Sequence, residues 1–414
     1  MEKRGSGVGN KSLLSVERAL EKIIKDLSVV STEETSLTSA INRVTAVEVR
    51  ARRCQPPVAV SAMDGYAVRK RDLSSLPKKF ELVGEIKAGD TISKAVKKNQ
   101  TFRIFTGAPI PNGANKVIIQ ENCLKDGKEV LIKKENKETY IRKKSHDISK
   151  KFTLKAPRLI STRDIALLGA MNHKKINVYR KPKVGILATG DEIIEVGDKT
   201  NNFNQPASSK PSIISLIKNW GGEPIDMGIA RDNSEDLIKN IKKGRKFDLF
   251  VTIGGASVGK YDLIQKSLSN QGFTLDFWKL AMQPGKPLMF GTNKNTSIIG
   301  LPGNPVSALV CSEIFLKKAV YALQGIKYKD TILIATLDND LNKNGSRRHY
   351  LRGKLYFDHK KNKMIVKSLN NQDRASLLPY SDANSLIILE PNEKKLRKGS
   401  KVKVFLLNLS LIHI

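Results

Sequence analysis

The middle of the chain alternates short apolar segments with segments of helical spacing, and this alternation constrains the fold more than any other feature. Residues 184–188, 248–253 and 297–301 have the length and composition of buried strands, and each precedes a loop that contains glycine. Helical patterns follow at residues 212–220 and 305–323. Strands that alternate with helices predict βαβ units, and therefore an α/β domain built on a mainly parallel sheet.

Helical spacing also occurs closer to the N-terminus. Apolar residues at 13–27 have helical spacing, with Ser12 or Ser15 as the N-cap, and residues 162–170 predict a further helix. Residues 36–53 continue in a helical or mixed pattern, which consecutive prolines at positions 56 and 57 interrupt.

Strand-like runs separated by turn residues occupy two other regions. In the first region they are residues 80–83, 101–105, 116–120 and 130–133. In the second they are residues 331–337, 364–367, 385–389 and 401–407. The first set predicts a compact β-rich insertion, and the second predicts a small β-barrel or sandwich.

Composition excludes several classes of protein. The 414 residues correspond to two to four domains at about 100–200 residues each. No membrane span or signal peptide is expected, because no long apolar run is present. The three cysteines form no CxxC pair, so we expect neither a zinc module nor a disulfide framework, and a cytoplasmic location is the default.

The net charge of +33 attracts polyanions. Lysines are spread along the whole chain, and the sequence has no RNA-binding aromatic signature or zinc-finger spacing. This distribution favours general surface charge over a nucleic-acid interface. An anionic small substrate would also benefit from such a field.

Three predicted strand-to-helix loops lie where open α/β sheets bind ligands, at the carboxyl ends of the strands. They are residues 188–192, 254–259 and 301–307. Glycines allow backbone N–H groups to approach an anion, and the start of a following helix adds a positive dipole end. One such loop is equally consistent with an ordinary tight turn, but three in one domain favour an anionic ligand.

Acidic and basic residues accompany these loops. Mg²⁺ allows acids and an anionic ligand to share one site, whereas helix capping explains each acid individually. As a group the acids favour a metal-assisted site. Lys286 lies within a rigid Pro-Gly-Lys-Pro segment and Lys279 lies beside it, so both are placed to neutralise an oxyanion. The acids concerned are Asp191, Glu192, Asp232 and Asp262.

Other catalytic patterns are missing from the sequence. No serine, histidine and aspartate arrangement, Walker A sequence or GxGxxG motif is present, which counts against a P-loop ATPase and a dinucleotide-dependent dehydrogenase. In the β-rich region, Asp64 and Thr106 lie at predicted turns, and their spacing alone does not indicate catalysis.

Six motifs nevertheless occur in a characteristic order. They are SAMDGYA (61–67), TGAPIPNGA (106–114), ATGDE (188–192), GGASVG (254–259), PGKP (284–287) and LPGNPVS (301–307). With these motifs, the chain from about residue 13 onward resembles the molybdopterin molybdenumtransferase family, the bacterial MoeA proteins, which is related to the gephyrin E domain.

The resemblance implies a multidomain α/β protein that works as a homodimer. Its expected parts are an N-terminal and linker dimerisation region at 11–53 and 148–180, a β-rich inserted domain at 54–147, a MogA-like three-layer α/β molybdopterin-binding domain at 181–327, and a C-terminal β-barrel domain at 328–414. The molybdopterin adenylyltransferase of the same pathway is a further candidate partner, and neither nucleic acid nor a membrane is expected.

The implied reaction is the last step of molybdenum-cofactor synthesis. The family inserts molybdate into adenylylated molybdopterin, releases AMP and uses Mg²⁺. The resemblance assigns catalytic roles to Asp64, Thr106, Asp147, Glu192, Asp232, Asp262 and Lys279, with Glu192, Asp232 and Asp262 as metal ligands. The expected substrate-binding residues are Thr189, Gly190, Asp191, Gly254, Gly255, Ser257, Gly259, Lys286, Pro302, Gly303, Asn304 and Pro305.

Several positions depart from the family pattern. Gln283 occupies a position that is usually Lys or Arg, Lys260 one that is usually acidic, and Arg374 one that is frequently Ser. Two alternatives therefore stay open: the adenylylating partner of the same pathway, and a non-catalytic molybdopterin-binding or scaffold protein of this fold. The insertion and the C-terminal region argue against the first, and the joint presence of the predicted catalytic acids argues against the second.

Overall fold

The computed structural model describes residues 13–91, 95–199, 201–255, 261–294 and 296–407. These residues divide into two compact units. The larger unit contains residues 13–33, 42–44 and everything described from 179 onward, and the smaller contains residues 34–41 and 45–178. None of the described helices is long and apolar enough to cross a membrane.

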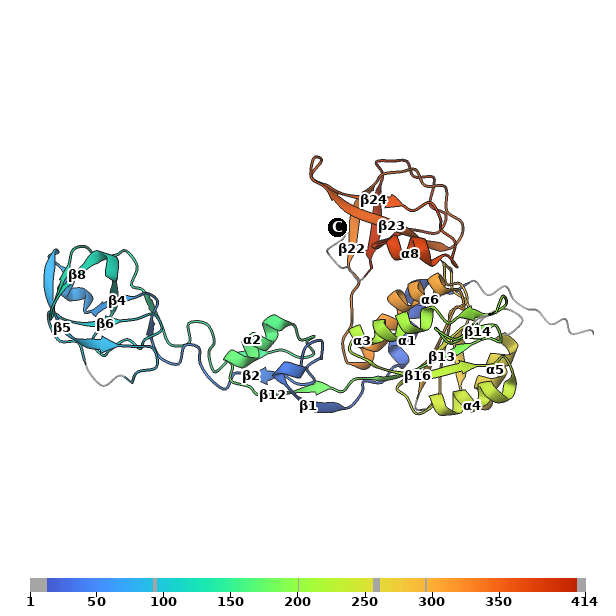
Figure 1. Ribbon diagram of the computed structural model, residues 1–414, viewed down its shortest axis with the longest axis horizontal. Helices are drawn as coiled ribbons and strands as arrows, with labels where there is room; N and C mark the ends of the chain where they lie inside the picture. The colour runs from blue at the N-terminus through green and yellow to red at the C-terminus, as the bar shows by residue number, and fades with distance from the viewer. Residues whose placement is uncertain (1–12, 92–94, 200, 256–260, 295, 408–414) are drawn as a thin grey trace, which may run out of the picture. The chain divides into compact units, whose positions relative to one another are not determined.

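A six-stranded sheet forms the centre of the larger unit (Figure 1). Its order is β16 (Glu223–Ala230), β13 (Lys183–Thr189), β17 (Leu249–Ile253), β21 (Ser297–Leu301), β20 (Met289–Thr292) and β18 (Thr274–Phe277). The first four strands are parallel, and the last two are antiparallel to their neighbours. The predicted mainly parallel sheet is therefore confirmed.

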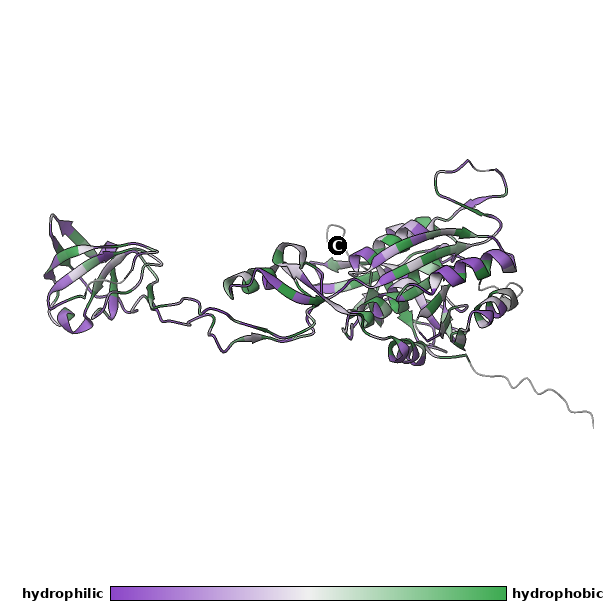
Figure 2. Cartoon of the chain, turned by 90° about the horizontal axis from the view of Figure 1, so that it is seen from below, coloured by the Kyte–Doolittle hydropathy of each residue, from purple (hydrophilic) through white to green (hydrophobic). Residues whose placement is uncertain are grey.

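Helices cover both faces of this sheet and make a three-layer domain. Figure 2 shows the apolar colour concentrated on the central strands. One layer holds α4 (Ser234–Gly244) and α5 (Tyr261–Asn270), which contact each other. The other holds α1 (Val16–Asp26), α3 (Ser209–Asn219), α6 (Pro305–Cys311), the π-helical turn Ser312–Leu316 and α7 (Lys317–Leu323). The predicted helix at 305–323 is thus confirmed, with a π-helical interruption.

Five strands near the C-terminus close into a barrel. They are β22 (Ile332–Leu337), β23 (Arg348–Asp358), β24 (Lys363–Ser368), β25 (Ser385–Leu389) and β26 (Lys401–Leu406). β23 pairs with both β24 and β25, and β22 and β26 complete the ring between them. This ring of pairings decides between the two predicted forms in favour of the barrel. Outside the ring lie α8 (Leu377–Asp382) and the short strand β19 (Met282–Gln283), which pairs with β23.

The smaller unit is built on a second six-stranded sheet. Its order is β7 (Lys116–Ile119), β4 (Gly65–Val68), β6 (Gln100–Ile104), β5 (Lys78–Ile86), β9 (Glu129–Ile132) and β8 (Cys123–Asp126). The predicted β-rich region is confirmed. The unit also contains α2 (Thr162–Ala170), β2 (Val49–Arg50) paired with β11 (Thr153–Leu154), and β3 (Val60–Ser61) paired with β10 (Ile141–Arg142). Strands β1 (Thr32–Ser36) and β12 (Lys175–Tyr179) also pair.

Local sequence determines where two of the helices begin. The Ser15 hydroxyl accepts the Arg18 N–H at the start of α1, and Ser161 and Asp164 form a capping box at the start of α2. Both helices were predicted. Of the helical or mixed pattern expected at residues 36–53, the structure has the mixed form, with the 3₁₀ turn Leu37–Ser39 and strand β2. Asn42 adopts a left-handed conformation there, which an α-helix does not accommodate.

Candidate active site

A cavity of about 880 Å³ lies at the carboxyl edge of the parallel strands. The chain leaves β13 toward β16 on one side, whereas it leaves the adjacent β17 toward β21 on the other. Such a reversal separates the loops that follow two neighbouring strands, and it is where open α/β sheets bind ligands. The loops after β13, β16, β17 and β21 all contribute to the cavity lining.

The loop after β17 packs closely against the end of β13. A Cβ atom at Gly254 would lie 2.7 Å from the Thr189 carbonyl oxygen, and one at Gly255 would lie 3.0 Å from Thr189 Oγ1. Both glycines have positive φ, so a side chain at either position is strained as well as crowded. Thr189, Gly254 and Gly255, which were predicted to bind substrate, therefore lie side by side in the cavity wall.

The Thr189 hydroxyl is available to a ligand. Thr189 is 4% exposed and lines the cavity, and its Oγ1 has no hydrogen-bond partner among the described residues. Buried hydroxyl groups are normally hydrogen-bonded. An oxygen of a bound ligand would satisfy this one.

Two predicted acids, Glu192 and Asp232, line the same cavity. Asp191 does not belong to the lining. Its Oδ1 accepts the Asp232 N–H at 3.0 Å, and its carbonyl accepts a hydrogen bond from Arg231 Nη1 at 2.9 Å. Asp191 therefore joins the loops after β13 and β16 and positions Asp232. Gly190 is the turn residue before it, with a φ of +146°.

These carboxylates fit the predicted Mg²⁺ in their chemistry. Mg²⁺ prefers oxygen ligands and commonly takes one or two carboxylates together with substrate phosphate. Glu192 and Asp232 supply two carboxylates beside a glycine loop. Among the described residues no cluster of three His, Cys, Asp or Glu side chains has metal-binding geometry, and the side chain of Asp262 in α5 is not among those described. Ser257, Gly259 and Lys260 also lie outside the described residues.

The third predicted loop completes the wall. Pro302, Gly303, Asn304 and Pro305 all line the cavity, and Asn304 is the N-cap of α6 with Pro305 in its first turn. The Gly254 N–H donates to the Leu301 carbonyl at 3.1 Å. The loops after β17 and β21 are therefore directly connected.

Lysines lie at the other side of the cavity. Lys279 and Lys286 line it, and Lys279 Nζ lies 3.8 Å from the ring centroid of Trp278. The Leu280 N–H donates to the Lys286 carbonyl at 2.9 Å, which closes the turn between these two lysines. Both cations therefore line the same cavity as the glycine loops.

Some lining residues were not predicted. They are Ile193, residues 205–210, Ile253, Trp278 and, from the C-terminal barrel, Ala375. Arg374, one of the departures from the family pattern, also lines the cavity. The parallel pair β14 (Ile193–Ile194) and β15 (Gln205–Pro206) brings residues 205–210 to the cavity. The run of polar residues before α3 is the sequence feature that could have indicated this. Lys210 is 3% exposed and paired with Glu195 at 2.6 Å and Asp226 at 3.0 Å, so its role is structural.

The smaller unit contains the remaining predicted catalytic residues. Asp64 Oδ1 accepts two hydrogen bonds from Thr106, one from the N–H and one from the hydroxyl. These bonds lower the pKa of the Asp64 carboxyl. Asp147 lines a separate cavity of about 1020 Å³ in this unit, together with Arg142 and His146.

The fold and this site define a class of protein: a multidomain α/β protein with a cavity lined by glycine loops, acids and lysines at a strand-order reversal, and with a C-terminal β-barrel. Residues 14–171 match the MoeA N-terminal region (domain I and II), residues 185–322 a probable molybdopterin binding domain, and residues 335–407 the MoeA C-terminal region (domain IV).

Full-length relatives give the same result. The chain is 31% identical over 400 residues to a molybdopterin molybdenumtransferase of Haemophilus influenzae, covering 95% of this chain and 98% of the relative. It is 31% identical over 385 residues to one of Nostoc sp., covering 90% and 88%. The solved molybdopterin biosynthesis MoeA protein of Pyrococcus horikosii superposes with a TM-score of 0.81 at 28% identity, covering 95% of this chain and 99% of that one. The chain therefore belongs to the MoeA family of molybdopterin molybdenumtransferases.

Proposed function

We infer that the chain is a molybdopterin molybdenumtransferase of molybdenum-cofactor biosynthesis. We further propose that it inserts molybdate into adenylylated molybdopterin with release of AMP. One observation supports this most directly: the glycine loops, Glu192, Asp232 and the two lysines all line a single cavity. Such a cavity has groups of the right charge for a nucleotide phosphate and for a dianion.

The glycine loops would bind the substrate phosphates. Gly254 and Gly255 expose backbone next to the unpartnered Thr189 hydroxyl, and any side chain there would obstruct a close approach. Asn304 and Pro305 set the direction of the third loop where it enters α6. These groups would hold the phosphoanhydride at the carboxyl edge of the sheet.

The acids and the lysines would bind ions of opposite charge. Glu192 and Asp232, with Asp262 as the third predicted ligand, would hold Mg²⁺, which when bound polarises the phosphoanhydride and offsets charge on departing AMP. Lys279 and Lys286 would bind molybdate as a dianionic substrate. Asp191 keeps Asp232 in place through its backbone N–H.

The smaller unit supplies further predicted residues. We propose that Asp64, held by Thr106, and Asp147 act in the same reaction, as the family resemblance implies. We also propose that residues 11–53 and 148–180 form the dimerisation region of a homodimer. The other proposed domains are the inserted domain at 54–147 and the domains at 181–327 and 328–414. The adenylyltransferase that makes the substrate is a proposed partner.

A reconstituted reaction tests the function. Purified protein is given adenylylated molybdopterin, Mg²⁺ and molybdate, and AMP is measured by chromatography. We expect AMP release that depends on molybdate, together with active cofactor. If molybdate does not stimulate AMP release, the chain is not a transferase and the non-catalytic binding protein replaces it.

A further inference from the structure

Acids and cations occupy different parts of the cavity wall. Glu192 and Asp232 follow β13 and β16, at one side of the sheet order. Lys279 follows β18, at the opposite edge, and Lys286 precedes β20 beside it. The cavity therefore has a cationic end that is separate along the sheet from its acidic end.

Arg374 adds a further cation to this lining, besides Lys279, Lys286 and the paired Lys210. It lies in the loop between β24 and α8, so it comes from the C-terminal barrel and not from the α/β domain. Its guanidinium makes no hydrogen bond or ion pair with any other residue that the structure describes. An arginine that lines a cavity without a protein partner is available to an anionic ligand.

The backbone around Arg374 is held firmly. The Arg374 carbonyl accepts the Val306 N–H at 3.2 Å, near the start of α6. The neighbouring Gln372 side chain accepts the Arg352 N–H at 2.9 Å and donates to the Leu369 carbonyl at 2.8 Å. The loop is thus fixed through main-chain contacts and neighbouring side chains. Replacing the Arg374 side chain removes none of these bonds.

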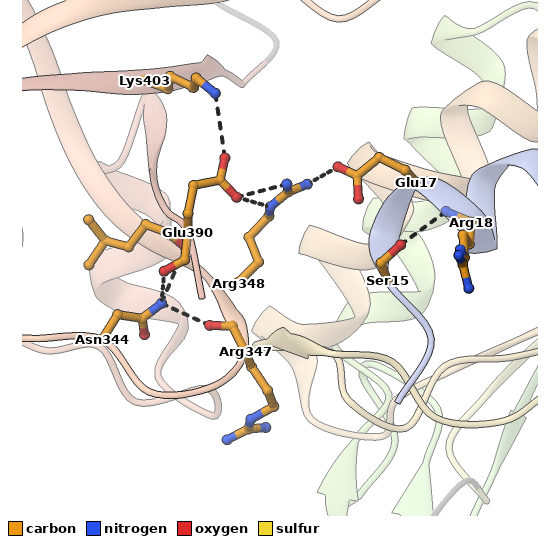
Figure 3. A network of polar contacts seen from close by, with 9 residues as sticks. Ser15, Glu17, Arg18, Asn344, Arg347, Arg348, Glu390 and Lys403 are labelled. Atoms are coloured by element: carbon orange, nitrogen blue, oxygen red, sulfur yellow. Dashed lines mark hydrogen bonds and ion pairs between the residues drawn. The ribbon is translucent and has the colours of Figure 1, made fainter. Parts of the chain in front are cut away.

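The barrel as a whole is also tied to the α/β domain (Figure 3). Arg348 of β23 hydrogen-bonds Glu390 within the barrel, with Nε 2.8 Å from Oε2, and forms an ion pair with Glu17 of α1. The Arg348 N–H donates to the Ala281 carbonyl at 2.9 Å. These contacts hold the barrel in the position at which its loop lines the cavity.

We propose that Arg374 binds a tetrahedral oxyanion of the substrates, in the cavity that Lys279 and Lys286 also line. This inference rests on the proposed function for the identity of the oxyanion, which is either molybdate or the phosphate of the nucleotide. A guanidinium is suited to this role because its planar N–H groups can contact two oxygens of one anion.

Direct binding tests the proposal without turnover. Trp278 lines the cavity, and the other tryptophan, Trp220, is 1% exposed, so quenching of tryptophan fluorescence reports on the site. Sodium molybdate and AMP are titrated separately into the full-length chain and its Arg374→Ala and Arg374→Lys variants. Arg397→Ala is the matched control, because it removes one exposed arginine from the same barrel.

We expect Arg374→Ala to raise the dissociation constant of at least one anion about tenfold or more, the effect of losing one charge-assisted hydrogen bond. Arg374→Lys should retain part of the affinity, and Arg397→Ala should bind as wild type. The anion whose affinity falls is the one that Arg374 contacts. Unchanged affinity for both anions in Arg374→Ala, or an equal loss in Arg397→Ala, overturns the proposal.

AMP release measured in parallel separates this inference from the proposed function. If the wild type releases AMP and Arg374→Ala binds and reacts equally well, only the role of Arg374 is rejected. If wild type and variant differ in anion binding but neither releases AMP, Arg374 binds an oxyanion and the transferase function is rejected.

Discussion

Thr106 donates two hydrogen bonds to one carboxylate oxygen of Asp64, from its N–H and from its hydroxyl, each at 2.8 Å. These bonds stabilise the ionised carboxyl and lower its pKa from the model-peptide value of 3.8. Asp64 is partly exposed, so the bonds affect its protonation more than the stability of the fold. The ionised form of Asp64 therefore persists to lower pH than it would without these bonds.

Removing the hydroxyl should weaken this control. In Thr106→Val the N–H bond remains and the hydroxyl bond is lost, so the pKa of Asp64 should rise toward its ordinary value. The acidic limb of the pH–rate profile should then move to higher pH. Carbon-detected NMR titration of the Asp64 carboxyl measures the shift, and Thr106→Ser, which keeps both bonds, should titrate as wild type.

The cavity acids should be essential for turnover and dispensable for folding. We expect Glu192→Gln and Asp232→Asn to lower kcat about a hundredfold or more, because each removes a charge from the proposed Mg²⁺ site. Chelation of Mg²⁺ should have the same effect on the wild type. Asp198→Asn, at an exposed position outside the cavity lining, is the control. Wild-type kcat in both cavity variants would contradict these roles.

Gly254→Ala should be costly for both stability and activity. Its Cβ would lie 2.7 Å from the Thr189 carbonyl oxygen, at a φ of +99°. We expect a loss of about 1–3 kcal/mol in the free energy of unfolding. Gly272 also has a positive φ, +77°, but nothing lies within 4 Å of its added Cβ. Denaturation of Gly254→Ala and Gly272→Ala therefore separates crowding from backbone strain, and equal losses would show that crowding contributes nothing.

The barrel should lose stability in mild acid. Burial, with Arg347 and Arg352 nearby, lowers the pKa of His349 from 6.5 to about 4. Because the unfolded chain takes up this proton at higher pH than the folded chain does, stability should fall as the pH drops from about 6.5 toward 4. Between about pH 6.5 and 4 the melting temperature of the wild type should therefore fall further than that of His349→Gln, which has no imidazole to protonate. The exposed His359 provides the control His359→Gln, which should leave the pH dependence of melting unchanged.

Much of the fold could be predicted because its signals are local. The strand at 297–301 and the helix at 162–170 have the predicted bounds, since apolar runs and caps such as the Ser161 and Asp164 capping box act over a few residues. Strand β23 was missed, because its basic residues obscure the alternation of apolar side chains. Arg352 of that strand is only 2% exposed. A single basic residue in a sequence gives no sign that its side chain is buried.

By itself, the sequence determined the order of strands and helices, the glycine loops and the acids that follow them, because these depend on neighbouring residues. The tertiary structure alone decided which loops share a cavity, that Asp191 supports Asp232 from outside the lining, and that Arg374 of the barrel reaches the site. Residues 374 and 279 are far apart in the chain. Only strand order and domain packing bring such positions to one cavity, and no local pattern encodes that proximity.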